Sequence, residues 1–192
     1  MIDLRTKGLP NSINVGGKSY VLYTDFREWL KFGEMLKDDS IFKDFNYIDL
    51  FFVIKDDVLA IEAIAYQKEF LEALINFYNN KNSTPIESTD TSNDIVWDYI
   101  QDGEYIVSSF MSQYNIDLTS CDMHWHMFKA LFIGLNDSTI MSQIMGFRSY
   151  KKDNKSYEKQ CQKLKNIWSL PKKENKNTNE ILKEIREEFY NT

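Results

Sequence analysis

Residues 121–148 read CDMHWHMFKALFIGLNDSTIMSQIMGFR, and this stretch decides the fold of the chain. Apolar side chains recur along its first half at steps of three and four, the spacing of one helical face: Trp125, Phe128, Phe132 and Leu135. The polar run 136–138 interrupts this pattern and can cap a second helix, which ends at Arg148. One side of that second helix carries Ile140, Ile144 and Phe147. The stretch therefore predicts a buried hairpin of two amphipathic helices.

Signals on either side of the stretch predict more helices. Thr119 and Asp122 lie three residues apart, the spacing of a capping box at the start of the first helix. Upstream, a helical pattern runs to Tyr114 after a short extended or turn segment over 94–100, and Asn115 suits a left-handed C-cap. Downstream, residues 155–168 predict a helix that Pro171 stops.

The N-terminal half begins with a β signal and continues with helical ones. Residues 11–23 alternate apolar and polar side chains on either side of Gly16-Gly17, which predicts a β-hairpin. A helix capped by Thr24 or Asp25 is expected to run through Lys37. Residues 44–54 predict a shorter helix or a turn-rich segment, with a strand left open. A clear helical pattern covers residues 60–78, with its apolar face made of Ile64, Leu71, Leu74, Ile75 and Tyr78.

These patterns predict a mainly α fold: a compact helical domain with a small N-terminal β-hairpin and a flexible C-terminal helical tail. We expect one domain over residues 1–171. Within it, residues 79–93 are rich in Asn, Ser and Thr and predict a mobile surface loop. Residues 172–192 predict a polar linker and a short C-terminal helix, which is too short to persist alone in water.

Charge is unevenly distributed along the 192 residues. The net charge is -6, yet residues 1–147 carry 11 basic and 22 acidic side chains, whereas residues 148–192 carry 12 basic and 7 acidic ones. An acidic balance argues against a general nucleic-acid binder, because phosphate contacts need clustered Lys and Arg. With no signal peptide and no apolar run long enough to span a bilayer, a cytoplasmic location away from the membrane is expected.

No motif in the sequence predicts catalysis or a metal site. His124 and His126 would point in different directions on a helix, with His124 in the apolar sector and His126 towards solvent, so they could not share an ion. Gly17-Lys18-Ser19 resembles the end of a phosphate-binding loop but lacks the earlier glycine and the following helix. Cys121 and Cys161 are too isolated for a zinc site. We therefore expect no enzyme and no cofactor.

Two features predict binding to other macromolecules. Residues 148–176 hold 10 basic and 3 acidic side chains with interleaved aromatics, and nucleic-acid binding through this segment is the alternative function. Methionines gather around the central hairpin, and such side chains suit both cores and adaptable binding surfaces. The side chains selected as partner-binding candidates are Trp125, Phe128, Phe132, Met141, Met145 and Arg148, with core packing as the alternative role of the aromatic ones.

An ordered set of residues carries a family resemblance: Asp98, Asp102 to Ile106, Phe110, Tyr114 to Leu118, His124-Trp125, Phe128 to Leu131, Leu135, Ile144, Phe147-Arg148, Tyr157, Leu164 and Trp168 to Pro171. With this set the chain resembles the bacteriophage gene product fifteen family of phages and prophages of low-GC Gram-positive bacteria. The resemblance covers roughly residues 18–172. Gly103 and His126 depart from the usual pattern of the family.

The resemblance implies a role in phage morphogenesis without catalysis. Genes of this family lie in the tail module just before the tape measure gene, the position of tail assembly chaperones in other long-tailed phages. Such chaperones keep the long, helical tape measure protein soluble while tail tube subunits polymerise around it. The implied partners are therefore the tape measure protein and the tail tube protein, and homo-oligomer formation is left open.

Overall fold

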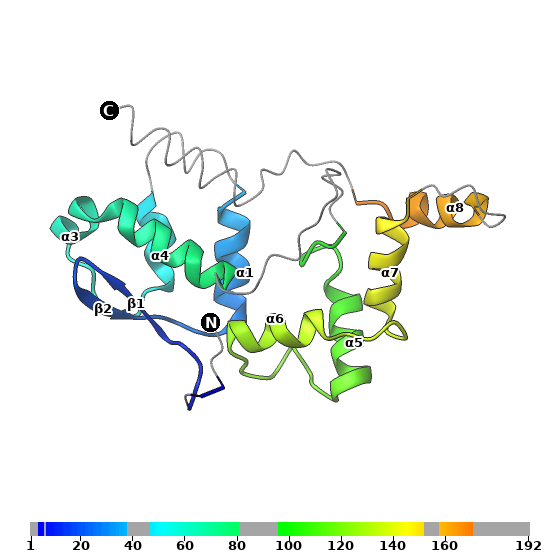
Figure 1. Cartoon of the computed structure of the whole chain (residues 1–192), viewed down its shortest axis with the longest axis horizontal. Helices are drawn as coiled ribbons and strands as arrows, with labels where there is room; N and C mark the ends of the chain where they lie inside the picture. The colour runs from blue at the N-terminus through cyan, green and yellow to red at the C-terminus, as the bar shows by residue number, and fades with distance from the viewer. Residues whose placement is uncertain (1–3, 6, 38–46, 81–95, 152–157, 171–192) are drawn as a thin grey trace. The chain divides into compact units, whose positions relative to one another are not determined.

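A computed structural model describes residues 4–5, 7–37, 47–80, 96–151 and 158–170 (Figure 1). Over these residues the chain is mainly helical, with one two-stranded antiparallel hairpin near the N-terminus, which confirms the predicted fold class. The predicted loop beyond residue 80 and the predicted linker and helix over 172–192 lie outside the described residues.

The contacts within the chain gather in two compact units. Unit 1 holds the described residues up to 80 together with residues 123–126, and unit 2 holds the described residues 96–122 and 127–170. The boundary falls inside one helix, α6 (Trp125–Ile133). The expectation of one domain over residues 1–171 stays a prediction.

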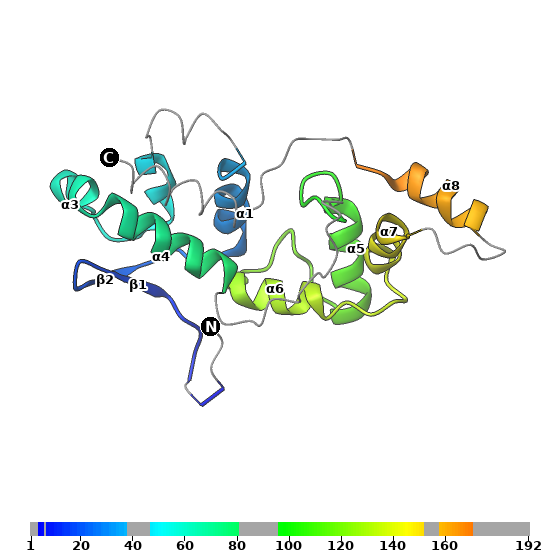
Figure 2. The same cartoon turned by 45° about the horizontal axis from the view of Figure 1, so that its top comes forward.

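Unit 1 starts with the predicted hairpin, which the structure confirms. Strands β1 (Ser12–Val15) and β2 (Lys18–Val21) pair antiparallel, with Ile13 opposite Tyr20. Gly16 and Gly17 both have positive φ (56° and 79°), as a two-residue type I′ turn requires. Alternate side chains face inwards and are buried: Ile13, Val15, Tyr20 and Leu22. The hairpin lies beside α4 (Gln67–Asn79) (Figures 1 and 2).

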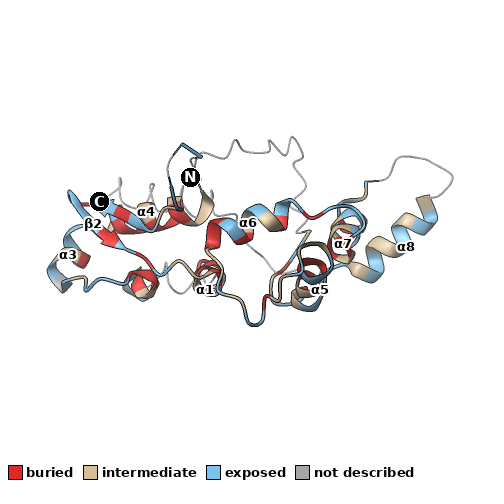
Figure 3. Ribbon diagram, turned by 90° about the horizontal axis from the view of Figure 1, so that it is seen from below, coloured by how far each residue is buried: buried red, intermediate tan, exposed pale blue. Residues whose placement is uncertain are grey.

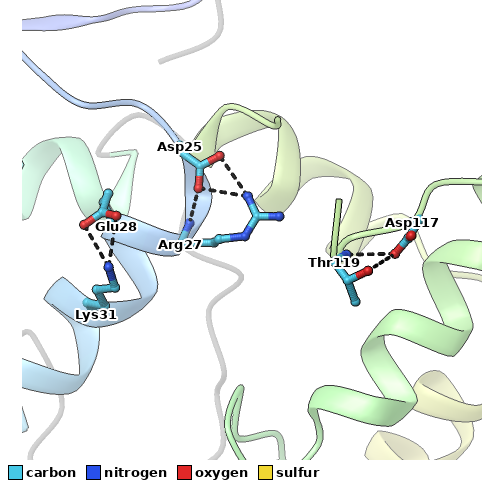
Figure 4. A network of polar contacts seen from close by, with 6 residues as sticks. All are labelled: Asp25, Arg27, Glu28, Lys31, Asp117 and Thr119. Carbon is cyan, nitrogen blue, oxygen red and sulfur yellow. Dashed lines mark hydrogen bonds and ion pairs between the residues drawn. The ribbon is translucent and has the colours of Figure 1, made fainter. Parts of the chain in front are cut away.

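The first helix begins at a predicted cap. In α1 (Phe26–Met35) the Asp25 carboxylate accepts the Arg27 backbone N–H at 2.9 Å and also the Arg27 guanidinium (Figure 4). A 3-10 helix, η1 (Tyr47–Val53), follows, which confirms the expected short helical segment. The core of unit 1 is aromatic, with fully buried Trp29, Phe32 and Phe70.

The helix predicted over residues 60–78 is two helices, and this prediction was wrong in its continuity. Helix α3 (Ala60–Ala65) ends and α4 begins on either side of Tyr66, whose φ of -119° and ψ of 22° interrupt the helical backbone. Tyr66 lies over the hairpin turn, where a Cβ on Gly16 would stand only 2.9 Å from its ring. The break explains why Ile64 is 71% exposed although it was predicted on the buried face.

Unit 2 contains α5 (Gly103–Tyr114), the rest of α6, α7 (Ile140–Ser149) and α8 (Glu158–Trp168). Figures 1 and 2 both show α5 beside α7, and α7 also contacts α8. Helix α5 ends as predicted, because Asn115 is left-handed (φ 55°) and its N–H bonds the Met111 carbonyl at 3.1 Å. The 121–148 stretch thus forms two helices, as predicted. Helix α7 packs mainly on α5 and α8, however, so the prediction of a hairpin in which the two helices pack on each other was wrong.

The predicted start of α6 was wrong by about five residues, since the cap is His124 and not Thr119. Asp117 accepts both the Thr119 backbone N–H and the Thr119 hydroxyl, which also lowers the pKa of the Asp117 carboxyl (Figure 4). Thr119 therefore stabilises a turn and does not cap α6. The cap of α6 is His124, whose Nδ1 accepts the His126 backbone N–H at 3.0 Å. The cap of α7 is Thr139, directly after the polar run 136–138.

Candidate partner-binding site

The structure places the predicted aromatic candidates of unit 2 in its core. Phe128 is 1% exposed and stacks on Phe110 with ring centroids 5.4 Å apart. Phe132 is 4% exposed and contacts the rings of Tyr99 and Trp97, each at 5.7 Å. These rings hold α5, α6 and the turn before α5 together, so their contacts are internal to unit 2.

Trp125 belongs to the core of unit 1. Its indole Nε1 donates to the Tyr78 carbonyl at 3.0 Å, and its ring stacks on that of Tyr78 at 5.2 Å. The Trp125 backbone N–H also donates to the Thr24 carbonyl at 2.8 Å. The tryptophan therefore joins the start of α6 to the start of α1 and the end of α4.

The two methionine candidates of α7 differ in burial. Met141 is fully buried, and its backbone N–H donates to the Ser109 hydroxyl of α5 at 3.1 Å. Met145 is half-buried. Because Ser109 in turn donates to the Tyr105 carbonyl at 2.7 Å, this chain of hydrogen bonds fixes the start of α7 on α5.

Arg148, predicted as a partner contact, forms the most enclosed ion pair among the described residues. Its guanidinium donates to both carboxylate oxygens of Asp102 at 2.6 and 2.8 Å, and both side chains are at most 6% exposed. The same guanidinium donates to the carbonyls of Val96 at 3.1 Å and Trp168 at 2.6 Å. A buried ion pair offsets the free-energy cost of desolvation only if its geometry is good and its remaining donors and acceptors form hydrogen bonds. The bidentate Arg148–Asp102 pair meets both conditions.

This ion pair fixes the turn over residues 96–102. Asp102 accepts the backbone N–H of Asp98 at 2.8 Å, and the Asp98 carboxylate accepts those of Ile100 and Gln101 at 2.9 Å each. The turn holds two apolar side chains towards solvent, with Trp97 40% and Ile100 68% exposed. Several residues that carry the family resemblance thus meet in one cluster: Asp98, Asp102, Arg148 and Trp168.

The exposed apolar face of α6 was missed by the sequence reasoning. Met127 is 41% and Ile133 73% exposed, and Ala130 between them is also exposed. These three residues follow one another at steps of three, so they share a face that is opposite to Phe128 and Phe132. Figure 3 shows exposed turns of α6 in pale blue between buried ones in red. We call Met127, Ala130 and Ile133 the outer face of α6.

A signal for the outer face was present in the sequence. Residues 125–133 read WHMFKALFI, with Lys129 as their single charged side chain. A helix that is apolar all round is normally buried all round. In this chain only one side is covered, and burial lowers the pKa of Lys129 to about 8. Contiguous exposed apolar patches are typical of interaction surfaces, so we take the outer face as the candidate site.

The histidines have structural contacts, but their predicted orientations were wrong. His126 is 2% exposed and its Nε2 lies 2.8 Å from the Phe77 carbonyl oxygen, whereas His124 is only half-buried. His124 differs because it precedes α6 and caps it. His126 lies within α6 but is buried because the start of α6 packs on the end of α4, where the Phe77 ring lies 4.5 Å from the His126 ring. Within the described residues no group of three His, Cys, Asp or Glu side chains could hold a metal ion.

The basic segment 148–176 is described in part, over 148–151 and 158–170. Arg148 is enclosed by its ion pair, and Lys165 donates to the Tyr150 carbonyl at 3.1 Å. Both cations therefore help to hold the segment on unit 2. None of the described helices is both long and apolar enough to cross a membrane.

Comparison with protein families gives a match over most of the chain. Residues 6–170 match the family described as "Bacteriophage Gp15 protein", and the chain belongs to this phage family. The match confirms the resemblance drawn from the ordered motif set. Comparisons with curated proteins and with solved structures return no match.

Proposed function

We propose that the chain is a tail assembly chaperone that binds the tape measure protein of its phage. Membership of the Bacteriophage Gp15 protein family supports a phage role. The tail-module gene position implied by the resemblance supports the narrower assignment. The observation that carries the proposal in the structure is the outer face of α6, which offers apolar helical surface to another chain.

The proposal describes a binding protein without a catalytic step or a cofactor, acting in the cytoplasm of the bacterial host. The tail tube protein is a second proposed partner. Nucleic-acid binding through residues 148–176 is disfavoured, since Arg148 is committed to Asp102 and the net charge of the chain is -6.

Co-expression tests the proposal. The chain is produced together with the tape measure protein encoded in the same phage genome, and the soluble fraction of the tape measure protein is measured. A higher soluble yield and co-purification are expected. An unrelated helical protein of similar size and charge serves as the control. If the soluble yield is the same with either companion and nothing co-purifies, the proposal is wrong.

A further inference from the structure

We infer that copies of this chain associate head to tail, with α8 of one copy lying on α3 of the next copy. The inference goes beyond the proposed function, because it concerns contacts between copies of the chain and not the binding of the tape measure protein. It starts from two exposed helical surfaces of opposite charge. One carries apolar side chains beside carboxylates, and the other carries lysines beside an apolar side chain.

The first surface consists of α3 and the residues that flank it. Four large apolar side chains are exposed there: Leu59 (59%), Ile61 (75%), Ile64 (71%) and Tyr66 (39%). Among the described side chains of α3, only that of Ala63 is buried. Contiguous exposed apolar side chains are typical of interaction surfaces. We call residues 59, 61, 64 and 66 the α3 surface.

Helix α3 is held in place by Glu62. A helix of six residues does not persist alone in water. The Glu62 carboxylate accepts the Leu59 backbone N–H at 3.4 Å, the Tyr20 hydroxyl at 3.2 Å and the Lys18 ammonium at 3.3 Å. These hydrogen bonds tie α3 to β2, so the helix is kept in position although its two isoleucines are exposed.

Carboxylates lie beside the α3 surface. Asp56 and Asp57 directly precede it in the sequence, and both are exposed. Asp56 accepts the Val21 backbone N–H at 2.6 Å. Asp57 forms no ion pair with any other described residue, so its charge is available to a partner.

The second surface is the outer side of α8. None of the eleven described residues of this helix is buried, and Figure 3 shows it in pale blue and tan. Lys159, Lys163 and Ile167 are exposed and follow one another at steps of four, so they lie along one side of the helix. Neither lysine forms an ion pair with the rest of the described chain, and like charges four positions apart repel each other. We call these three residues the α8 surface.

Charge decides which surfaces of two copies can meet. Two α3 surfaces in contact would bring like-charged Asp57 carboxylates together, and two α8 surfaces would bring four ammonium groups together. Contact between an α3 surface and an α8 surface instead places lysines beside carboxylates, with apolar side chains on both sides. Because each copy then contributes a different surface, the contact is heterologous, and a third copy can add in the same way.

The spacing along the two surfaces fits helices that run parallel. In α8, Lys163 precedes Ile167 by four positions, which is about 6 Å along the helix axis. Asp57 likewise precedes Ile61 by four positions. In a parallel arrangement Ile167 can pack on Ile61 and Ile64 while Lys163 approaches Asp57.

The size of the contact predicts weak association. Each surface offers three or four side chains, much less than the roughly 800 Å² per partner of a standard stable interface. We therefore expect a dissociation constant of about 0.1–1 mM. In sedimentation velocity experiments on the full chain at rising concentration, the weight-average mass should increase beyond that of a dimer, because a heterologous contact does not stop at two copies.

Reversing single charges tests which surfaces meet. Asp57→Lys alone and Lys163→Glu alone should each weaken the association about tenfold, because each places like charges across the contact. Asp137→Lys and Lys7→Glu reverse exposed charges elsewhere and should leave the association unchanged. Circular dichroism checks that each variant folds like the unaltered chain.

An equimolar mixture of the two single variants gives the complementary measurement. Each variant then meets the opposite charge on the other one, so the association should return to the level of the unaltered chain. Three results would overturn the inference: the unaltered chain stays monomeric up to millimolar concentration, one of the single variants associates like the unaltered chain, or the mixture does not recover.

A photo-crosslinking residue at position 167 identifies what covers the α8 surface. The chain that carries it is mixed with an isotope-labelled chain that does not, so a crosslink between copies joins unlabelled and labelled peptides. Crosslinks to residues 59–66 of the labelled copy are expected, and crosslinks to another region or within one copy would contradict the inference. The tape measure protein is absent from all these experiments, so their failure is independent of a failure of the proposed function.

Discussion

Arg148 shows how one residue can look like a surface cation in the sequence and be part of the core. In the sequence it directly follows the apolar positions of the helix predicted to end at residue 148, and it is the first residue of the basic segment 148–176. In the structure its guanidinium links the turn before α5, the end of α7 and the end of α8. The charge is buried because Asp102, 46 positions earlier, is buried opposite it.

Asp102→Asn tests this ion pair. The substitution keeps the size of the side chain but leaves the Arg148 charge buried without its counter-ion, so the free energy of unfolding should fall by about 3–5 kcal/mol. Urea unfolding measures it. Glu28→Gln is the control, because the Glu28–Lys31 pair on α1 is partly exposed to solvent and should contribute about 0.5 kcal/mol or less (Figure 4). Equal effects of the two substitutions would contradict the enclosed role of Asp102.

His124 should make stability depend on pH. Burial lowers the pKa of His124 below its usual 6.5, and a backbone hydrogen bond with Pro10 offsets this only in part. The unfolded chain therefore binds more protons than the folded chain as the pH falls below about 6.5, and folding loses stability there. His124→Asn keeps a side-chain cap for α6 without titrating. Its unfolding free energy should fall less steeply between about pH 6.5 and 5, and parallel slopes in the two proteins would contradict this assignment.

At the scale of elements, the ends of helices depend on single residues. Asn115 ends α5 in a left-handed conformation, which Asn and Gly tolerate and β-branched residues do not. Asn115→Val should therefore lower the free energy of unfolding by about 1–2 kcal/mol, and Asn115→Gly should leave it nearly unchanged. Thermal unfolding followed by circular dichroism compares the two. If both substitutions lower the free energy of unfolding equally, the left-handed backbone conformation at position 115 is not the reason for the loss of stability.

The elements also show what the sequence could predict. The hairpin, α1 and the end of α5 were predicted because Gly16-Gly17, Asp25 and Asn115 act on their immediate neighbours. The break at Tyr66 was not predicted, since no glycine or proline marks it within residues 60–78. In the structure the Tyr66 ring lies against Gly16, 50 positions away in the sequence. Local signals fix where an element turns or stops, and long-range packing can still divide it.

The same limit applies to the candidate site. Spacing identified the apolar side of α6 that carries Phe128 and Phe132, but spacing cannot say whether a face is covered by the chain itself or by a partner. In the structure Phe128 and Phe132 are buried by other residues of the chain, whereas Met127 and Ile133 are exposed. The ion pair between Asp102 and Arg148 could not be predicted from the sequence either, because no periodic pattern connects a turn with the end of a distant helix.

For the whole molecule, the charge distribution predicts weak affinity for nucleic acid. The chain carries a net charge of -6, and Arg148 and Lys165 of its basic segment already have contacts within unit 2. In a gel-shift titration at low salt, the chain should not retard random-sequence double-stranded DNA at micromolar concentration. A phage DNA-binding protein is the positive control. Retardation that weakens steeply with added salt would contradict the prediction.

The placement of the four tryptophans gives each unit its own optical reporters. Trp29 and Trp125 are 0% and 1% exposed in unit 1, whereas Trp97 is 40% exposed and Trp168 half-buried in unit 2. Indole fluorescence shifts to longer wavelength when the ring is exposed to water. The buried tryptophans of unit 1 should therefore emit at shorter wavelength, and the more exposed ones of unit 2 should be quenched more readily by acrylamide. Replacing the more exposed pair, Trp97 and Trp168, with phenylalanine would let the melting of unit 1 be followed by Trp29 and Trp125 alone, without an added dye.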